Sequence, residues 1–276
     1  MRKSILITGC SSGIGYEVAH GLQQAGWRVF ATCRQQKDVE RLQTEGLESI
    51  RLDYSDETSI RIALAWVLEQ TGGTLDALYN NGAFACPGAT EDLPRAALRE
   101  IFEVNVFGYH DLTRLVIPVM RAQGHGHIIN CSSILGLVVA PWRGAYNTTK
   151  FALEGLTDTL RIEMQDTNIK VVLLEPGPVT SDIRKKSIPH FEKWVDWENS
   201  PRAQQYRDKL LPRLHAKKTG KDPFELPASA VTKKLLKILA TTNPKPRYYI
   251  TTATYIMGAL KRALPSRALD WILSRG

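Results

Sequence analysis

A tyrosine and a lysine lie four residues apart in the stretch "AYNTTKFALEG", where an apolar helical pattern begins. On a helix, Tyr146 and Lys150 would share one face. A phenol has an ordinary pKa of about 10, and a nearby ammonium lowers that pKa toward the range in which a phenol transfers protons near neutral pH. Most pairs at this spacing are surface neighbours, so the pair alone does not establish catalysis.

Two polar residues upstream strengthen the catalytic interpretation. Ser133 ends the apolar run "HIINCSS", 13 residues before Tyr146, and Asn105 lies inside the helical pattern "FEVNVFG". Because strand C-termini of a doubly wound sheet form one ligand crevice, we expect Ser133 to lie over the Tyr146 and Lys150 face and to bond a substrate oxygen. Asn105 is either a polar group satisfied in the core or the holder of a water that links Lys150 to solvent.

A glycine-rich turn, "TGCSSGIG", lies between the first predicted strand and the first predicted helix. Glycine tolerates positive φ and lets a pyrophosphate approach the backbone at a helix N-terminus. The spacing is TGxxxGxG, and the strand-turn-helix context favours a nucleotide site over a merely tight turn. The cofactor-binding residues expected in this turn are Gly9, Ser11, Ser12, Gly13, Ile14 and Gly15.

The end of the second predicted strand, "VFATCRQ", bears on the choice of nucleotide. An acidic residue there would bond the ribose 2′-hydroxyl of NAD, whereas Arg34 offers donors to a 2′-phosphate. With Ser12 as a further donor, the sequence predicts NADP(H) in preference to NAD(H), and the alternative is an exposed surface arginine. Asp53, in "RLDYSD", would either accept a bond from the adenine amino group or form a turn. In this scheme Lys150 bonds the nicotinamide ribose, and Tyr146 passes the proton beside the cofactor.

The elements that must position these residues can be read from short apolar runs. The predicted strands are "SILITG", "RVFATC", "SIRLD", "LDALYNN", "HIINCSS" and "KVVLLEPG", with a last strand at "RYYITT". Helical patterns separate them, the longest covering residues 94–120 and 146–165, with another near 230–239. Continuous apolar strands alternating with helices predict a parallel sheet covered on both faces. We therefore expect an α/β, doubly wound, Rossmann-like single domain over residues 1–276.

Taken together, these motifs resemble the short-chain dehydrogenase/reductase family from about Ser4 to Ile183. The stretches "TGCSSGIG", "YNTTKFALEGL" and "LLEPGPV" look most like its 17β-hydroxysteroid and retinol dehydrogenase group and bacterial relatives. The resemblance implies a catalytic set of Asn105, Ser133, Tyr146 and Lys150, with Tyr146 and Lys150 also touching an NAD(P) cofactor. It also implies that Val179 and a hydroxyl at Ser181 or Thr180 meet the nicotinamide carboxamide.

Two stretches depart from the family pattern. The family usually reads NNAG after its fourth strand, where this chain has "NNGA", residues 80–83. Both transposed residues are small, so Asn81 is retained as an expected cofactor contact. The stretch "PGPVTSD" differs from the family pattern PGxVxT. Ser181 aligns with the threonine of that pattern, and Thr180 is the alternative source of the hydroxyl that meets the nicotinamide.

The resemblance assigns the segment after Ser181 to the substrate. Residues 182–227 form a polar insertion that is expected to cap the substrate, and its aromatic residues are Phe191, Trp194, Trp197 and Tyr206. They either line an apolar pocket or pack the insertion onto the body of the protein. The expected substrate is a small apolar carbonyl compound or alcohol, such as a steroid, a retinoid or a long-chain aldehyde.

Charge is distributed unevenly along the chain. The net charge of +8 arises in residues 181–276, which hold 20 Lys and Arg against 8 Asp and Glu, whereas residues 1–180 hold 16 against 20. The tail, residues 252–276, is basic and amphipathic, which suits either an anionic membrane surface or packing on the body or a partner subunit. No module that reads nucleic acid accompanies the charge, so no nucleic acid partner is expected.

These observations converge on one main function and one alternative. We expect an NADP(H)-dependent oxidoreductase that interconverts a carbonyl and an alcohol, with Tyr146 as general acid and base and no metal. The alternative is a silent NADP sensor on the same fold, against which the complete Ser133, Tyr146 and Lys150 set argues. Four widely spaced cysteines indicate a reducing, cytoplasmic location, with peripheral membrane contact as one use of the tail, and we expect a homo-oligomer.

Overall fold

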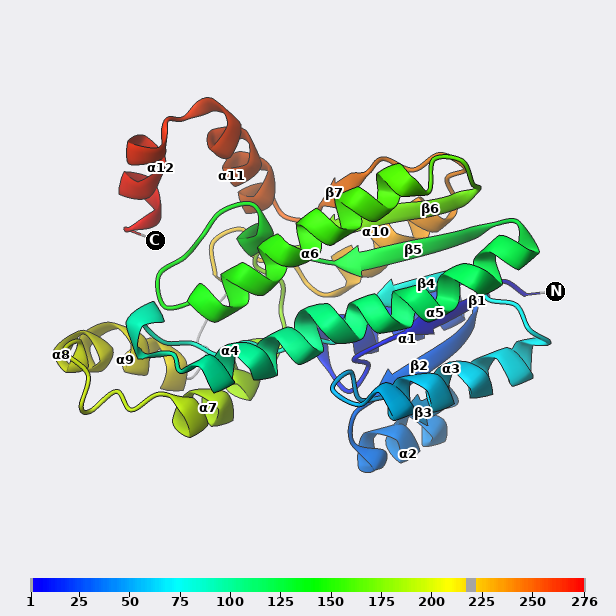
Figure 1. Cartoon of the computed structure of the whole chain (residues 1–276), viewed down its shortest axis with the longest axis horizontal. Helices are drawn as coiled ribbons and strands as arrows, with labels where there is room; N and C mark the ends of the chain where they lie inside the picture. The colour runs from blue at the N-terminus through cyan, green and yellow to red at the C-terminus, as the bar shows by residue number, and fades with distance from the viewer. Residues whose placement is uncertain (1, 217–221, 276) are drawn as a thin grey trace.

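A computed structural model describes residues 2–216 and 222–275 of the chain. Its centre is one seven-stranded parallel sheet in the order β3-β2-β1-β4-β5-β6-β7 (Figure 1). The strands are β1 (Ser4–Ile7), β2 (Arg28–Cys33), β3 (Glu48–Arg51), β4 (Ala77–Asn80), β5 (Gly126–Cys131), β6 (Ile169–Glu175) and β7 (Arg247–Tyr249). Each strand begins within, or one residue before, an apolar run from which a strand was predicted, and the expected doubly wound α/β class is confirmed.

The central strands are apolar on both faces because helices cover both faces of the sheet. In β1, Ile5 and Ile7 pack in one core and Leu6 packs in the other, and all three are fully buried. The first core includes residues of α1 (Gly13–Gln24), α2 (Gln36–Thr44) and α10 (Ser229–Leu239). The second includes residues of α3 (Glu57–Thr71), α5 (Gly108–Gln123) and α6 (Gly144–Glu163). This double coverage is the physical reason for the uninterrupted apolar runs.

The long helix predicted over residues 94–120 is not one regular α-helix. It consists of α4 (Arg95–Phe102), the π-helical turn η2 (Glu103–Phe107) and α5. The π-helical turn is built around Asn105, whose side chain is fully buried. Short π-helical insertions of this kind occur frequently at functional sites. The prediction was therefore right about the helical run and wrong about its regularity.

Two groups of helices stand at the end of the sheet toward which the strand arrows point (Figure 1). The first follows β6 and comprises α7 (Ile183–Trp194), α8 (Ala203–Gln205), the π-helical turn η4 (Tyr206–Leu210) and α9 (Leu211–His215). The second is the C-terminal pair α11 (Thr252–Ala263) and α12 (Ser266–Leu273), separated at Pro265. Part of the expected insertion, residues 217–221, lies outside the described residues. We call α7 to α9 the cap helices below.

Two 3₁₀ turns complete the described elements, η1 (Thr90–Asp92) and η3 (Ile134–Gly136). The second follows β5 directly and begins after Ser133. Within residues 2–216 and 222–275, no helix combines the length and the apolar character needed to cross a membrane.

Candidate active site

A large cavity opens at the carboxyl end of the sheet. Its volume is about 2530 Å³, and it is lined by the loops that follow β1, β4, β5 and β6 together with the cap helices and α12. Single ligand pockets usually measure about 300–1,000 Å³. The cavity therefore has room for a dinucleotide and a second molecule.

Helix α6 brings Tyr146 and Lys150 into this cavity. Both side chains are almost completely buried, and the Lys150 ammonium donates a hydrogen bond of 2.7 Å to the Cys131 carbonyl at the end of β5. That nitrogen lies 5.5 Å from the centres of the Tyr146 and Tyr109 rings. The expected pair is thus assembled, with the lysine anchored to the sheet and two of its N–H groups not used by this bond.

The pKa of Tyr146 does not move in the direction expected from the sequence. Burial raises the pKa of the phenol well above its ordinary value, and a hydrogen bond with Ser133 and the charge of Arg143 oppose this only in part. Burial also lowers the pKa of Lys150, against the charges of Cys131 and Glu154. The sequence shows the pairing of the two groups but not their desolvation. In this structure Tyr146 is therefore a weaker acid than a free phenol.

Ser133 joins Tyr146 as predicted. It follows β5 and caps the turn η3, where its Oγ accepts a bond of 3.1 Å from the Leu135 N–H. The cap holds the hydroxyl beside the Tyr146 phenol, close enough to oppose in part the rise in the pKa of that phenol. A carbonyl oxygen placed between these two hydroxyls would be within reach of two donors.

The Asn105 side chain is satisfied by protein groups. Its Oδ1 accepts the Phe84 N–H at 3.1 Å, and its Nδ2 donates to the Phe84 carbonyl at 2.9 Å and to Thr149 Oγ1 at 3.2 Å. The amide therefore ties the loop after β4 to α6 beside Lys150. Of the two roles considered from the sequence, the core role accounts for these contacts, and the water-holding role stays a prediction.

The glycine-rich turn has the shape that a phosphate requires. Gly9 has φ +71°, and a Cβ there would lie 2.5 Å from the Gly82 Cα. Gly13 has φ +61°, and a Cβ there would lie 3.2 Å from the Ser181 Cβ. Helix α1 begins at Gly13 without a side-chain cap, which leaves its first N–H groups free for an anion. Ser11, Ser12 and Ile14 line the cavity, and Gly15 packs against the turn.

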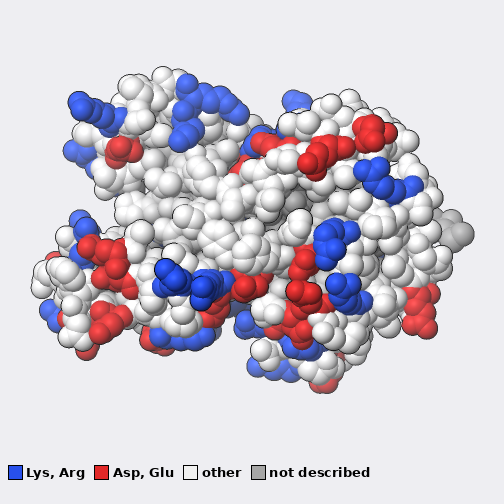
Figure 2. All heavy atoms as spheres, viewed as in Figure 1, with Lys and Arg blue, Asp and Glu red and all other residues white. Residues whose placement is uncertain are grey.

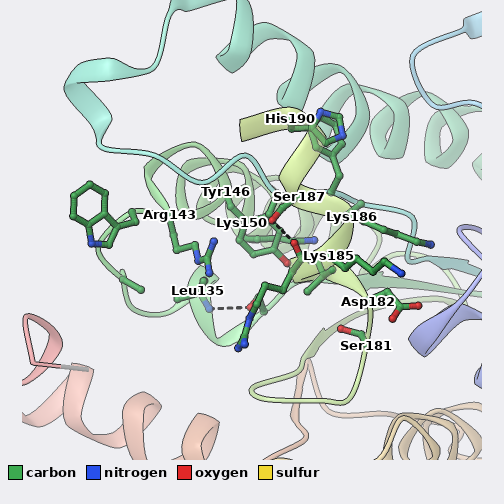
Figure 3. A pocket seen from close by; sticks show the side chains of 18 of the residues that line it. Leu135, Arg143, Tyr146, Lys150, Ser181, Asp182, Lys185, Lys186, Ser187 and His190 are labelled. Atoms are coloured by element: carbon green, nitrogen blue, oxygen red, sulfur yellow. Dashed lines mark hydrogen bonds between the residues drawn. The ribbon is translucent and has the colours of Figure 1, made fainter. Parts of the chain in front are cut away.

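A lysine that the sequence reading missed reaches this turn. Lys186, on the first turns of α7, donates to Ser12 Oγ at 2.5 Å and to Ser11 Oγ at 3.2 Å. Figure 3 shows its side chain extending from α7 toward the N-terminal strand and helix. Arg34 is exposed and lines the same end of the cavity. Two cations thus flank the predicted nucleotide turn, and the only sequence signal for Lys186 was its place in the "RKK" run after Asp182.

Asn81 and Asp53 are both held by neighbouring protein groups. Asn81 Nδ2 donates to the Thr8 carbonyl at 3.0 Å, which braces the glycine-rich turn. The Asp53 carboxylate accepts from the N–H and the Oγ of Ser55, and it also lines the cavity. Asp53 is therefore a turn aspartate in this structure, and its bond to adenine stays a prediction.

The alternatives at Thr180 and Ser181 differ in position. Thr180 Oγ1 donates to Glu225 at 2.7 Å and is absent from the described cavity lining, whereas Ser181 lines the cavity beside Gly13. Val179 also lines the cavity and pairs with Leu226. These positions favour Ser181 for the predicted nicotinamide contact.

The insertion aromatics do not line the described cavity. Phe191 and Tyr206 are buried in a cluster that packs the cap helices onto α4 and the start of α6, and Trp194 and Trp197 border this cluster. The packing interpretation of these four residues is the one that the structure supports. Apolar lining comes instead from residues not singled out in the sequence: Phe84, Leu135, Val138, Val139, Trp142 and Met257.

Known proteins share this fold and this sequence. The family model for short chain dehydrogenase matches residues 3–191. The chain is 37% identical over 273 residues to the uncharacterized oxidoreductase YbbO of Escherichia coli K12, covering 99% of this chain and 94% of that protein. It is 31% identical to retinol dehydrogenase 8 of Bos taurus, with 97% and 87% covered. A short-chain dehydrogenase/reductase of Burkholderia phymatum, solved in complex with NAD, matches with TM-score 0.77 and 26% identity, covering 99% of this chain and 95% of that one.

The fold and the site thus define an NAD(P)-dependent oxidoreductase. The chain belongs to the short-chain dehydrogenase/reductase family. The resemblance inferred from the sequence is confirmed, including its likeness to retinol dehydrogenases and to bacterial relatives.

Proposed function

We propose that this protein is an NADPH-dependent reductase of an apolar aldehyde or ketone. The observation that carries the proposal is the arrangement of Tyr146 beside Ser133 and Lys150 in a cavity that also contains a glycine-rich helix N-terminus. A phenol next to a second hydroxyl and a buried ammonium can donate a proton to a carbonyl oxygen, which is the proton-transfer step of reduction.

The residues present fit a dinucleotide. The positive φ of Gly9, the close approach of Gly13 to Ser181 and the uncapped start of α1 make a cradle for a pyrophosphate. Gly9, Ser12 and Gly13 would hold the phosphates, and Ser181 and Lys150 would hold the nicotinamide end. When bound, the nicotinamide supplies hydride to the substrate.

Three side chains of the chain then perform the protein's share of the reaction. Ser133 orients the substrate oxygen, and Tyr146 donates the proton to it. The buried Lys150 ammonium, 5.5 Å from the Tyr146 ring, favours the negative charge that develops on the phenol as the proton leaves.

The preference for NADP(H) rests on charge. Arg34 and Lys186 line the end of the cavity near the glycine-rich turn, and both can pair with a 2′-phosphate. We expect Arg34→Asp and Lys186→Gln each to raise the KM for NADPH at least tenfold while changing the KM for NADH much less. Arg95→Gln, at an exposed position outside the described cavity lining, serves as a control. Equal changes for the two cofactors would remove this assignment.

The main experiment is an NADPH-oxidation screen over steroids, retinoids and aliphatic aldehydes with wild-type protein and Tyr146→Phe. We expect the variant to lose about 10²- to 10⁴-fold in kcat, the usual contribution of general acid catalysis. A Tyr146→Phe variant with wild-type kcat on the best substrate would exclude the proposed acid. Absence of turnover with retained NADPH binding would favour the sensor alternative.

An apolar face supports self-association. Phe107 and Ile162 are 49% and 57% exposed, and Phe151 and Leu156 are also exposed on α6. Figure 2 shows a broad area without charged residues across the middle of the face on which Figure 1 draws α4 and α6. Contiguous exposed apolar patches frequently mark interfaces. We propose a homo-oligomer, to be tested by light scattering of wild type and Phe151→Glu, and a monomeric wild type would contradict it.

The C-terminal pair α11 and α12 supports peripheral membrane contact. Trp271 and Tyr255 are 61% and 53% exposed, and Lys261 and Arg262 lie in the last turn of α11. Basic amphipathic helices bind anionic lipid surfaces through this combination. In flotation with anionic liposomes, we expect the wild-type protein to be recovered with the liposomes and Trp271→Glu not to be. Absence of both proteins from the liposome fraction would exclude the contact.

A further inference from the structure

An arginine that the proposed reaction does not use lies beside Tyr146. Arg143 is the residue immediately before α6 and lines the cavity three residues ahead of Tyr146. In Figure 3 the Arg143 and Tyr146 side chains rise from the same end of one helix, and the Arg143 guanidinium extends into the cavity. An arginine at this position lies close to the reacting atoms.

The Arg143 guanidinium has no hydrogen-bond or ion-pair partner within residues 2–216 and 222–275. The charges that act on it are those of Arg213, Arg184 and Tyr146, and no carboxylate is among them. Arg184 has its own partner, Asp222, at 3.3 Å. Burial and the two neighbouring arginines lower the pKa of Arg143 to about 10, so it remains charged at neutral pH. A half-buried cation without a counter-charge is unfavourable, and a bound anion would relieve it.

The backbone that presents Arg143 is held in place by specific contacts. Trp142 has φ +64°, a left-handed conformation that residues with a Cβ rarely adopt. Its carbonyl accepts the Gly88 N–H at 3.0 Å, and its ring packs on Tyr206 at 4.9 Å. Tyr206 in turn donates to the Asp92 carboxylate at 2.7 Å. Strained residues of this kind cluster at ligand sites, where the surrounding structure enforces them.

The surroundings of Arg143 differ from those of the cofactor cradle. The cations at the cradle are Lys186, which contacts Ser11 and Ser12, and Arg34. Arg143 instead follows the loop that contributes Val138 and Val139 to the cavity lining. Among the cations that line the cavity, Arg143 is therefore the one that lies next to this apolar wall and three residues from the proton donor.

We propose that Arg143 binds a carboxylate of the substrate, so that the substrate is an apolar oxo acid whose carbonyl reaches Tyr146 and whose carboxylate reaches Arg143. The inference rests on the proposed reductase function and adds the charge of the substrate to it. A guanidinium matches a carboxylate with two parallel hydrogen bonds. Of the two neighbouring arginines, Arg184 is paired with Asp222 and Arg213 is exposed. Among the described residues, Arg143 is therefore the half-buried cation of the three that lacks a counter-charge. Because Arg143 and Tyr146 are three residues apart, the carboxylate and the carbonyl would lie on neighbouring parts of the same molecule.

The test compares three matched compounds: an oxo fatty acid with its carbonyl close to the carboxylate, its methyl ester and its phosphate-bearing analogue. With wild-type protein we expect kcat/KM for the acid to exceed that for the ester about 10- to 100-fold, the range of a charge-assisted bond. In Arg143→Gln the ratio of acid to ester should fall to about one, and Arg143→Lys should keep part of it. Arg95→Gln should keep the full ratio.

Several results would overturn the inference. They are an acid-to-ester ratio near one in the wild type, an unchanged ratio in Arg143→Gln, and a preference for the phosphate analogue over the acid. A further result is that Arg143→Gln raises the KM for NADPH by the same factor by which it lowers kcat/KM for the acid. That result would assign Arg143 to the cofactor site and would overturn the inference as well. Thermal unfolding of each variant checks that the fold is intact.

A binding measurement separates this inference from the proposed function. Calorimetry with a saturated fatty acid and its methyl ester needs no turnover, and we expect the wild type to bind the acid more tightly and Arg143→Gln to bind the two alike. One outcome is that the wild type binds the acid more tightly than the ester and Arg143→Gln binds both alike, while none of the compounds is reduced. That outcome would remove the reductase proposal and support the anion site. Reduction of the compounds without any preference for the acid would support the reductase proposal and remove the anion site.

Discussion

A buried cluster of charges behind the active site predicts an unusual dependence of stability on pH. Glu175, fully buried at the end of β6, accepts from Arg247 Nη1 at 2.6 Å, and the same guanidinium also bonds Glu154 and Asp158 of α6. The Arg247 guanidinium thus faces three carboxyl groups, of which Asp158 also pairs with Arg161 at 3.1 Å. Burial and the charge of Glu154 raise the pKa of Glu175 to about 8, and burial also raises the pKa of Glu154. The pair therefore holds a proton in the folded chain at neutral pH, which we assign to Glu175.

The sign of the effect follows from proton linkage. An unfolded glutamate titrates near 4.3, so between about pH 4.3 and 8 the folded state holds a proton that the unfolded state has released. Stability therefore falls as pH rises through this window, by at most about 1.4 kcal/mol per pH unit and about 5 kcal/mol in all. Glu175→Gln keeps an uncharged group of the same shape and removes the titration. We expect it to match the wild type near pH 5 and to exceed it by about 3–5 kcal/mol at pH 9.

The assay is urea denaturation of wild type and Glu175→Gln across this pH range, with exposed Glu163→Gln as a surface control that should follow the wild type. An infrared band of a protonated carboxyl, present in the wild type at pH 7 and lost in Glu175→Gln, provides an independent check. Stability curves of wild type and Glu175→Gln that run parallel within about 0.5 kcal/mol would show that Glu175 is ionised in the fold, and the reasoning would fail.

Two further predictions concern buried hydrogen bonds. Asn105→Ala leaves the Phe84 N–H and carbonyl and the Thr149 hydroxyl without their partner, so we expect a loss of about 2–4 kcal/mol in the free energy of unfolding by urea titration. A loss below about 1 kcal/mol would mean that water replaces the amide. Tyr206→Phe removes a bond to the Asp92 carboxylate and one from a loop N–H, which should lower stability by about 1–3 kcal/mol in thermal unfolding. An unchanged midpoint would contradict the anchoring role given to this ring.

The sheet could be predicted from the sequence because its physical cause is local. Ile5, Leu6 and Ile7 form an uninterrupted apolar run, and such a run is expected only when helices bury both faces of a strand. The positions of Ser133, Tyr146 and Lys150 followed from the same logic, since the carboxyl ends of parallel strands share one edge. These parts of the prediction depended on spacing and on topology.

What could not be predicted depends on contacts between distant segments. Lys186 lies far along the chain from Ser12, and only the fold of α7 over the first turn brings them together. The raised pKa of Tyr146 results mainly from burial of its phenol in the folded chain, which no residue pattern in the sequence reports. The aromatic residues of the insertion are a second example. Their composition predicts an apolar surface, but it does not show whether that surface lines the cavity or packs against the body of the protein.

The π-helical turn η2 has a consequence for how this chain tolerates changes in length. A π-helical turn contains one residue more than the α-helical turn it replaces, and each residue of an α-helix advances the direction of its side chain by about 100°. Deletion of a single residue within Glu103–Phe107 would restore a regular helix and rotate α5 relative to α4, so that Asn105 and the buried face of α5 could not both keep their partners. The number of residues in this segment is thus as strict a requirement as their identity, and an insertion or deletion there should be far more damaging than one in an exposed loop.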